Sequence, residues 1–300
     1  LELGGKGANI IFADADAGAV KRGVLHMMNN SGQSCNAPSR MLVERQVYDR
    51  VVEEAAEVAK AVKVGPASEP GHHIGPVVNR RQWEQIQGYI RSGIGEGARL
   101  VAGGPGLPEG FNRGFFVRPT VFADVKPGMT IEREEIFGPV MAIIPFDSEE
   151  EALAIANDTP YGLTNYVQTG DGARANRLGL RLQAGMIEMN GKPRGAGSPF
   201  GGTKQSGRAR EGGVWGIEEF LEVKPGGPEA RRAGNGEGVA PRATPSEFQG
   251  DGPVRSRPNQ RSKSEGLPSE DGPPDCPDTS LQYHSRHWIT SFQKVAIRER

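Results

Sequence analysis

The sequence predicts an α/β fold with a largely parallel sheet over residues 1–224 of the 300-residue chain. Short apolar segments alternate with segments whose apolar residues recur at helical spacing. Strands that alternate with helices in this way are typical of parallel sheets. A third observation limits the fold to this range: the composition changes near residue 224, and Pro, Gly, Arg and Ser dominate beyond it.

Five short apolar segments are expected to form the strands of this sheet. Brief apolar runs bounded by turn-forming residues are typical of buried strands. The five segments are residues 8–12, 40–44, 140–145, 163–168 and 186–190.

The expected helices lie between these strands. Ser148 followed by Glu151 forms a capping box, which predicts a helix start at that point. The expected helices cover residues 16–29, residues 46–62, a segment through Trp83 and Ile94, residues 148–157 and residues 172–183.

The composition excludes several classes of function. The formal net charge is -1, which gives no electrostatic reason to expect nucleic acid or an anionic membrane as a partner. No run of about 18 apolar residues occurs, so no transmembrane helix is expected. The two cysteines, Cys35 and Cys276, lie far apart, which excludes a disulfide framework and favours a reducing, cytoplasmic location. His72 and His73 have no nearby Cys or carboxylate partner in their Pro- and Gly-rich loop, so no metal site is expected.

Cys35 is a candidate nucleophile. It follows a predicted helix through the Gly-containing turn at residues 31–34. The thiolate is the reactive form of cysteine, and backbone N–H groups or a helix dipole in such a turn can stabilise it. A lone cysteine is more often a small buried apolar residue. The polar neighbours Ser34 and Asn36 weaken that alternative without removing it.

Glu2 is a candidate general base. It lies between Leu1 and Leu3, ahead of a Gly-Gly turn, and a carboxylate near apolar groups can have a raised pKa. A solvated surface glutamate is the alternative. The next residues, 4–7, lack the spacer and the Lys-Ser/Thr ending of a phosphate-binding loop, so that function is excluded.

Two further patches could shape a ligand site. Glu135, Phe137 and a Gly-Pro turn precede the strand expected at residues 140–145. The glutamate could accept hydrogen bonds from ribose hydroxyls, and the phenylalanine could pack against a flat ring. An ordinary turn with one exposed glutamate and one core phenylalanine is the alternative. Residues 198–207 form a Gly-rich loop, which alone indicates only a shaped loop.

Together the four patches resemble the motifs of the aldehyde dehydrogenase superfamily. Leu-Glu-Leu-Gly-Gly-Lys at residues 1–6 is similar to the family's glutamate motif, and Gly-Gln-Ser-Cys at residues 32–35 is similar to its cysteine motif. Residues 135–140 resemble the cofactor-contact motif, and residues 199–207 resemble the late Pro-Phe-Gly-Gly loop. The motifs occur in the family's order and at its spacing, and the resemblance covers residues 1–224.

The resemblance implies oxidation of an aldehyde to a carboxylic acid with NAD or NADP. Cys35 would attack the aldehyde to give a thiohemiacetal and then a thioester, and its backbone N–H would form part of the oxyanion hole. Glu2 would activate the water that hydrolyses the thioester. Glu135 would bind the nicotinamide ribose, Phe137 would pack near the nicotinamide, and Gln82 would reach the same ribose.

The resemblance also implies a domain organisation. Residues 1–207 would form the catalytic domain, and residues 208–224 a C-terminal segment with an oligomerisation strand near residues 217–224, through which subunits pair into a homo-oligomer. The resemblance does not extend to residues 225–300. A disordered tail is expected there, because residues 225–280 contain only four large apolar residues. This segment would be either a genuine tail that binds a partner or the product of a frame change.

Family members carry a long N-terminal portion ahead of the glutamate motif, whereas this chain begins at Leu1. We therefore expect a C-terminal fragment with a truncated dinucleotide-binding domain and no hydride transfer by the 300-residue chain alone. The alternative function is that of an inactive fragment or an oligomerisation module. The sequence does not indicate which aldehyde the parent enzyme would oxidise.

Overall fold

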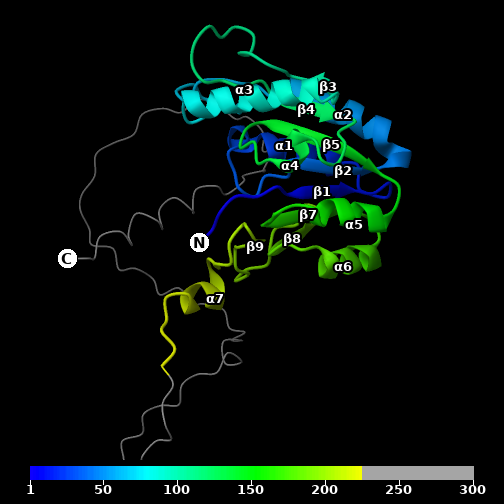
Figure 1. Cartoon of the computed structure of the whole chain (residues 1–300), viewed down its shortest axis with the longest axis vertical. Coiled ribbons are helices and arrows are strands. Elements are labelled where there is room, and N and C mark those ends of the chain that lie inside the picture. The colour runs from blue at the N-terminus through cyan, green and yellow to red at the C-terminus, as the bar shows by residue number, and fades with distance from the viewer. Residues whose placement is uncertain (225–300) are drawn as a thin grey trace, which may run out of the picture. The chain divides into compact units, whose positions relative to one another are not determined.

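The computed structural model describes residues 1–224, which form an α/β fold around a seven-stranded sheet (Figure 1). The strand order is β3-β4-β5-β2-β1-β7-β8, and only β3 at one edge runs antiparallel to its neighbour. The predicted α/β class with a largely parallel sheet is confirmed. The strands are β1 (Ala8–Ile11), β2 (Arg40–Glu44), β3 (Arg99–Ala102), β4 (Thr120–Ala123), β5 (Val140–Phe146), β7 (Thr164–Gln168) and β8 (Met186–Met189).

All five expected strands are present, as β1, β2, β5, β7 and β8. Strands β3 and β4 of this sheet, which contain four residues each, were not among the expected strands. In β3 the first two residues, Arg99 and Leu100, are exposed. A four-residue strand that is half exposed has too few apolar residues to show the pattern by which strands are recognised in a sequence.

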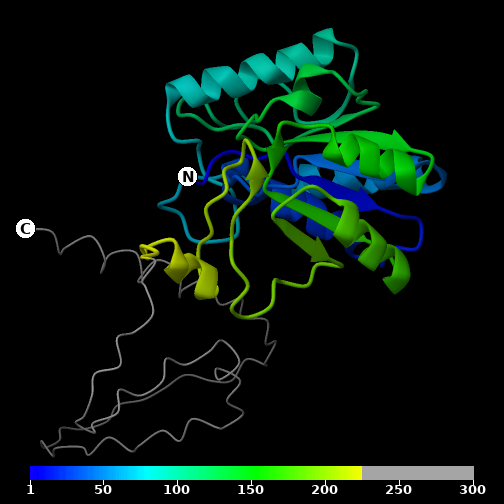
Figure 2. The same ribbon diagram turned by 60° about the horizontal axis from the view of Figure 1, so that its bottom comes forward.

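Helices cover both faces of the sheet. One face packs on α1 (Ala19–Met28) and α2 (Tyr48–Ala61), and the other packs on α3 (Arg80–Gly95), α4 (Thr130–Arg133), α5 (Glu149–Asn157) and α6 (Gly172–Arg181). Helices α5 and α6 lie side by side in both views (Figure 1, Figure 2), and Arg177 and Glu149 form an ion pair between them at 2.8 Å. None of the helices within residues 1–224 is both long and apolar enough to span a membrane.

The alternation of side chains along the strands explains the two cores. In β5, Ala142 and Ile144 pack in the cluster on the α3 side, whereas Met141 and Ile143 pack in the cluster on the α1 side. Because both faces are buried, the strand is a continuous apolar run rather than an alternating one. Because both faces of the strands are buried, the strands are fixed in place. The loops at their ends, where the candidate site lies, are fixed with them.

The ends of two helices differ in detail from the capping pattern. Ser148 accepts a hydrogen bond from Glu151 N at 3.2 Å, as expected, but the Glu151 carboxylate accepts from Asp147 N rather than from Ser148. The helix expected at residues 16–29 begins three residues later and ends in a turn where Asn30 and Ser31 have φ of 51° and 57°. Left-handed backbone at two successive non-glycine residues stops a helix.

One prediction needs correction at the C-terminal end. Residues 217 and 218, assigned above to an oligomerisation strand, belong to helix α7 (Gly213–Glu218), and residues 219–224 adopt no regular structure. An edge strand needs a partner to hydrogen-bond with, and a single chain supplies none here. Pairing between subunits therefore stays a prediction. The disordered tail predicted at residues 225–300 lies outside the described residues.

Candidate active site

The candidate residues Glu2, Cys35 and Glu135 meet at one edge of the sheet. Each lies in the loop that leads into a parallel strand: Glu2 before β1, Cys35 before β2 and Glu135 before β5. The site is therefore at the amino ends of the strands, whereas open α/β sheets usually bind ligands at the carboxyl ends. We call this cluster of three residues the Cys35 corner.

The thiol and the first carboxylate face each other. Cys35 Sγ lies 3.8 Å from Glu2 Oε1, with the thiol as donor. Cys35 sits in a turn closed by a hydrogen bond from Ala37 N to Ser34 O at 3.1 Å. The two side chains, 33 residues apart in sequence, are thus within reach for proton transfer.

Burial first, and then the nearby Glu2 carboxylate, raise the pKa of the Cys35 thiol, which the backbone at Cys35 and Asn36 partly offsets; the resulting pKa is about 11. Burial also raises the pKa of Glu2, and Glu211 adds to that shift. The resting form of Cys35 is therefore the thiol rather than the thiolate. The surroundings of Cys35 disfavour a permanently ionised thiol, so a function that depends on such a reactive thiol does not fit this site.

The Gly-Gly turn after Glu2 is required by close packing. A Cβ at Gly4 would overlap the carboxylate of Glu135, and a Cβ at Gly5 would overlap the carbonyl oxygen of Cys35. The absence of two side chains therefore lets both partners approach the glutamate segment. This explains in physical terms why Gly-Gly follows Glu2.

Glu135 is fixed by the same turn. Its Oε1 accepts a hydrogen bond from Gly5 N at 2.9 Å. Burial raises its pKa, while the Gly5 N–H and the ammonium of Lys6 lower it. The neighbouring Phe137 is 38% exposed and has a left-handed φ of 53°. A large ring held toward solvent by strained backbone is available to contact a ligand.

Gln82, near the start of α3, supports the Glu135 loop. Its Nε2 donates to Ile136 O at 3.1 Å and to Phe137 O at 3.0 Å. These bonds hold the strained backbone of Phe137. The contact of Gln82 with a ribose stays a prediction.

Ser206 lies in the Gly-rich loop, and no pattern in the sequence indicated its role. It is fully buried, donates to Gly4 O at 2.6 Å and accepts from Gly162 N at 3.0 Å. Its own carbonyl accepts from Leu3 N at 2.9 Å. The loop therefore anchors the segment that carries Glu2.

A buried ion pair behind the Cys35 corner was also missed. Arg40 Nη1 lies 3.1 Å from Glu132 Oε1, with side chains 0% and 2% exposed. Arg40 Nε also donates to Lys6 O at 3.1 Å. The Lys6 Nζ atom is buried without a hydrogen-bond partner among the described residues, and burial, together with the nearby Arg40, lowers the pKa of Lys6 to about 7. No spacing in the sequence signals this pairing, since the partners are 92 residues apart.

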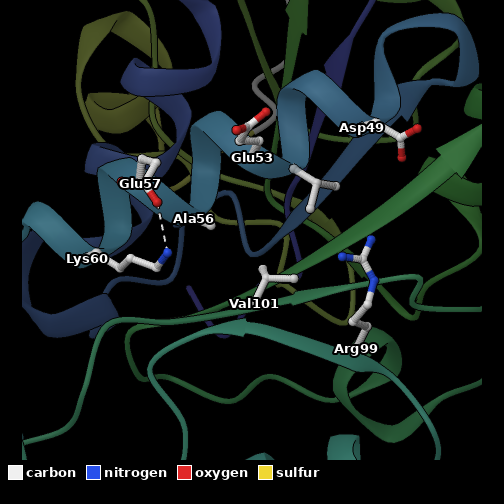
Figure 3. Close-up of a pocket in the computed structure, with 8 residues that line it drawn as sticks. Asp49, Glu53, Ala56, Glu57, Lys60, Arg99 and Val101 are labelled. Carbon is white, nitrogen blue, oxygen red and sulfur yellow. Dashed lines mark hydrogen bonds and ion pairs between the residues drawn. The ribbon is translucent and has the colours of Figure 1, made fainter.

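A pocket of about 380 Å³ lies elsewhere, between α2 and β3 (Figure 3). We call it the α2–β3 pocket. Figure 3 shows Lys60 directed to Glu57, an ion pair of 2.8 Å, and Arg99 on the opposite wall. The lining residues are Asp49, Val52, Glu53, Ala56, Glu57, Lys60, Arg99 and Val101, and they include no residue of the four motifs.

The described residues offer contacts for a dinucleotide cofactor but no metal cluster. Glu135 supplies a half-buried acceptor and Phe137 an exposed ring on the same loop, which suits a ribose and a flat ring. Within residues 1–224 no group of three or more His, Cys, Asp or Glu side chains could hold a metal ion.

The fold and the facing thiol and carboxylate define an α/β protein with a candidate cysteine nucleophile. The chain belongs to the aldehyde dehydrogenase family, whose family model matches residues 1–225. A 3-succinoylsemialdehyde-pyridine dehydrogenase of Pseudomonas sp. is 50% identical over 225 residues, which make up 75% of this chain and 47% of that protein.

Solved structures of the family share the fold. The crystal structure of an aldehyde dehydrogenase from Bartonella henselae is 60% identical, with a TM-score of 0.74 over 75% of this chain and 47% of that one. A mutant aldehyde dehydrogenase of Pseudomonas syringae, in complex with NAD+ and octanal, is 47% identical, with a TM-score of 0.73 over 74% and 46% of the two chains. The chain thus spans about half the length of these relatives.

Proposed function

We propose that this chain carries the nucleophile and the base of an enzyme that oxidises an aldehyde to a carboxylic acid with NAD or NADP. The observation that carries the proposal is the 3.8 Å approach of Cys35 Sγ to Glu2 Oε1. Membership of the aldehyde dehydrogenase family supports it. A cytoplasmic location is part of the proposal, because two distant cysteines suit a reducing compartment.

In the first step Cys35 Sγ bonds to the aldehyde carbon while the thiol proton passes to Glu2. The product is a thiohemiacetal whose oxygen would lie near the Cys35 backbone N–H. The bound cofactor supplies the acceptor for the hydride that leaves this carbon. Loss of the hydride leaves a thioester on Cys35.

Before the second step Glu2 releases the thiol proton to solvent. A water molecule then attacks the thioester carbon, and the ionised Glu2 takes the proton of that water and passes it on to the departing sulfur. The carbon–sulfur bond breaks, the carboxylic acid leaves and Cys35 regains a proton. A raised pKa makes Glu2 a stronger base than an exposed glutamate. Because its first task is to deprotonate a thiol whose pKa is about 11, the base has to contact the thiol directly, as it does here.

For the cofactor we propose Glu135 as the acceptor from ribose hydroxyls, Phe137 as the wall beside the ring and Gln82 as a further ribose contact. The Gly5 N–H bond to Glu135 leaves the second carboxylate oxygen, Oε2, next to Gly4. The substrate is proposed only as an aldehyde. Octanal and NAD+ occur in the complex of the Pseudomonas syringae relative.

A second candidate function is that of an oligomerisation module without activity. The observation that favours it is the exposed apolar segment at the end of the described chain. Ile217, Phe220 and Val223 are 66%, 90% and 94% exposed, which is typical of a surface that another chain covers. A homo-oligomer formed through this segment is compatible with either function.

The test separates nucleophile chemistry from cofactor chemistry. The purified chain is given p-nitrophenyl acetate, an activated ester whose hydrolysis needs a nucleophile and a base but no hydride acceptor. We expect p-nitrophenolate release, loss of that release in Cys35→Ser, and an acetylated protein that accumulates in Glu2→Gln, as seen by mass spectrometry. Activity that persists in Cys35→Ser would remove the thiol from the mechanism.

The full reaction is tested on a protein that joins this chain to the portion preceding residue 1 in its relatives. NADH or NADPH formation from an aldehyde, abolished by Cys35→Ser, is the expected result. An inactive joined protein that still assembles through residues 217–224 would favour the module instead.

A further inference from the structure

The segment that leads into Cys35 has an unfavourable backbone. Asn30, Ser31 and Gly32 are three successive residues with left-handed φ angles of 51°, 57° and 69°. This conformation costs free energy at residues that carry a side chain, so Asn30 and Ser31 keep it only where other groups hold them. We call residues 29–37, which contain Cys35, the cysteine turn. The shape of this turn therefore depends on the contacts that it makes with the rest of the fold.

Two side chains at the start of the cysteine turn bond to the short segment that precedes α3. Ser31 is buried, and its Oγ donates to Gly75 O at 2.7 Å. The Oε1 atom of Gln33 accepts from Val78 N at 2.9 Å, and the Nε2 atom of the same amide donates to Asn30 O at 3.1 Å. Because Gln33 and Val78 are 45 residues apart, one amide joins the strained backbone of the turn to a separate part of the fold.

The residues after the nucleophile are held by different contacts. The hydroxyl of Tyr166, on β7, donates to Asn36 O at 2.6 Å. The carbonyl oxygen of Cys35 lies against Gly5, where a Cβ would overlap it. Loss of the Gln33 amide would therefore release the start of the cysteine turn and leave the contacts at its end in place.

We propose that Gln33 and Ser31 are positioning residues for Cys35: their bonds to the segment before α3 keep the strained start of the turn in the shape that holds the thiol against Glu2. The inference rests on the proposed function, in which Glu2 takes the thiol proton. Cys35 Sγ and Glu2 Oε1 are 3.8 Å apart, so a small displacement of the turn takes the thiol out of reach of its base. Both side chains act through the backbone of the turn.

The experiment measures how fast p-nitrophenyl acetate acetylates Cys35 in the 300-residue chain, with Cys276→Ser as background and the protein in excess over the ester. In this single turnover Cys35 Sγ bonds to the acetyl carbon, the bond to the p-nitrophenolate oxygen breaks and the thiol proton passes to Glu2. Gln33→Met keeps a side chain of similar length but has no amide. We expect its acetylation to be about ten- to hundredfold slower than that of the parent chain.

The same comparison is then made with the base removed. Glu2→Gln has no carboxylate to accept the thiol proton, so displacement of the thiol from this side chain has no further effect. We expect Gln33→Met to change the acetylation rate by less than about twofold in the Glu2→Gln background. A merely structural role would lower the rate by the same factor in both backgrounds, because it would reduce the amount of folded protein. The dependence on Glu2 therefore distinguishes positioning from stability.

Gln87→Met is the matched control. The Oε1 atom of Gln87 also accepts from the backbone of a separate segment, at Gly106 N with a distance of 2.6 Å, but this bond joins α3 to the loop after β3 and not to the cysteine turn. We expect acetylation at the rate of the parent chain in both backgrounds. Ser31→Ala is a second variant, which removes the other bond of the turn, and we expect the same Glu2-dependent slowing. It decides the question if circular dichroism shows that Gln33→Met does not fold.

The outcomes separate the inference from the function on which it rests. The positioning role is overturned if the parent chain is acetylated at Cys35 but Gln33→Met and Ser31→Ala react at the parent rate. Equal slowing with and without Glu2, or equal slowing in Gln87→Met, overturns it as well. In each of these cases the proposed nucleophile stands. If the parent chain is not acetylated, or is acetylated without Cys35, the proposed function fails and the inference falls with it.

Discussion

The α2–β3 pocket and the Cys35 corner are two polar regions of one domain with opposite character. The pocket has a volume of about 380 Å³, and its charges stay in water: Lys60 and Glu57 are 56% and 68% exposed in their ion pair. At the Cys35 corner, by contrast, burial raises the pKa of Glu2, Cys35 and Glu135.

The two regions differ in how far their charged groups are desolvated. Exposed charges interact weakly because water and salt screen them. Half-buried groups that share one turn change each other's protonation instead. Each experiment below asks whether that contrast holds, and the effects are ordered by expected size.

The sharpest test of the contrast compares two arginines. Arg40→Met removes one partner of the buried Arg40–Glu132 pair and leaves Glu132 uncompensated, so we expect about 3–5 kcal/mol lower free energy of unfolding. Arg99→Met breaks the exposed pair with Asp124 beside the α2–β3 pocket, with an expected effect of at most about 1 kcal/mol. Urea denaturation of both variants measures the difference. Similar values for the two would contradict the contrast.

Two glycines give the next largest effect. Gly5→Ala places a methyl group against Cys35 O, and we expect a loss of about 1–3 kcal/mol from overpacking. Gly88 lies in α3 with open space around it, so Gly88→Ala is expected to stabilise by about 0.5–1 kcal/mol. Thermal unfolding compares them. Tolerance of Gly5→Ala would mean that the corner is more loosely packed than described.

Two glutamates should respond to pH with opposite signs. Burial raises the pKa of Glu135 above 4.5, so its ionisation weakens the fold as pH rises through that raised pKa. Glu135→Gln should therefore raise Tm at pH 8 but not below pH 4.

The hydrogen bond from Arg177 lowers the pKa of Glu149. Ionised Glu149 therefore stabilises the fold above pH 4.5, and this contribution is lost as the pH falls. Glu149→Gln should lower Tm at pH 8 only. Calorimetry across this range checks both signs.

The smallest expected effect belongs to the pocket itself. Lys60→Ala removes the exposed ion pair with Glu57, which lies on α2, away from the cysteine turn. We expect the alkylation rate of Cys35 to change by less than about twofold, because screened surface charges act only over short distances. A larger change would show that the two regions are coupled.

Sequence patterns predicted an element correctly where the residues of a short segment specify its structure without distant contacts. The apolar run at residues 140–145 and the Ser148 cap each specify an element locally. The backbone of the turn after α1 could not be predicted in this way, because Asn30 and Ser31 adopt left-handed conformations that neither residue type requires. Gly32, which follows them, packs against Gly138 O from another loop.

For the candidate site, too, the sequence predicted some residues and could not indicate others. Its motifs named Cys35, Glu2 and Glu135, and the structure brings these three residues together; their roles stay predictions. The contacts of Arg40 with Glu132 and of Tyr166 with Asn36 could not be found in this way, because the partners lie more than ninety residues apart in sequence. Such contacts exist only once the sheet is assembled.

The hydrogen bond from Ser206 Oγ to Gly4 O joins the two ends of the described fold across 202 residues. A growing chain cannot make this bond until nearly all of the domain has been synthesised. The segment with Glu2 therefore lacks its Ser206 contacts while the seven strands of the sheet form, and long-range closure of this kind is slow. Ester hydrolysis by the Cys35 corner should then appear as a late event in refolding, after the helical circular dichroism signal has recovered.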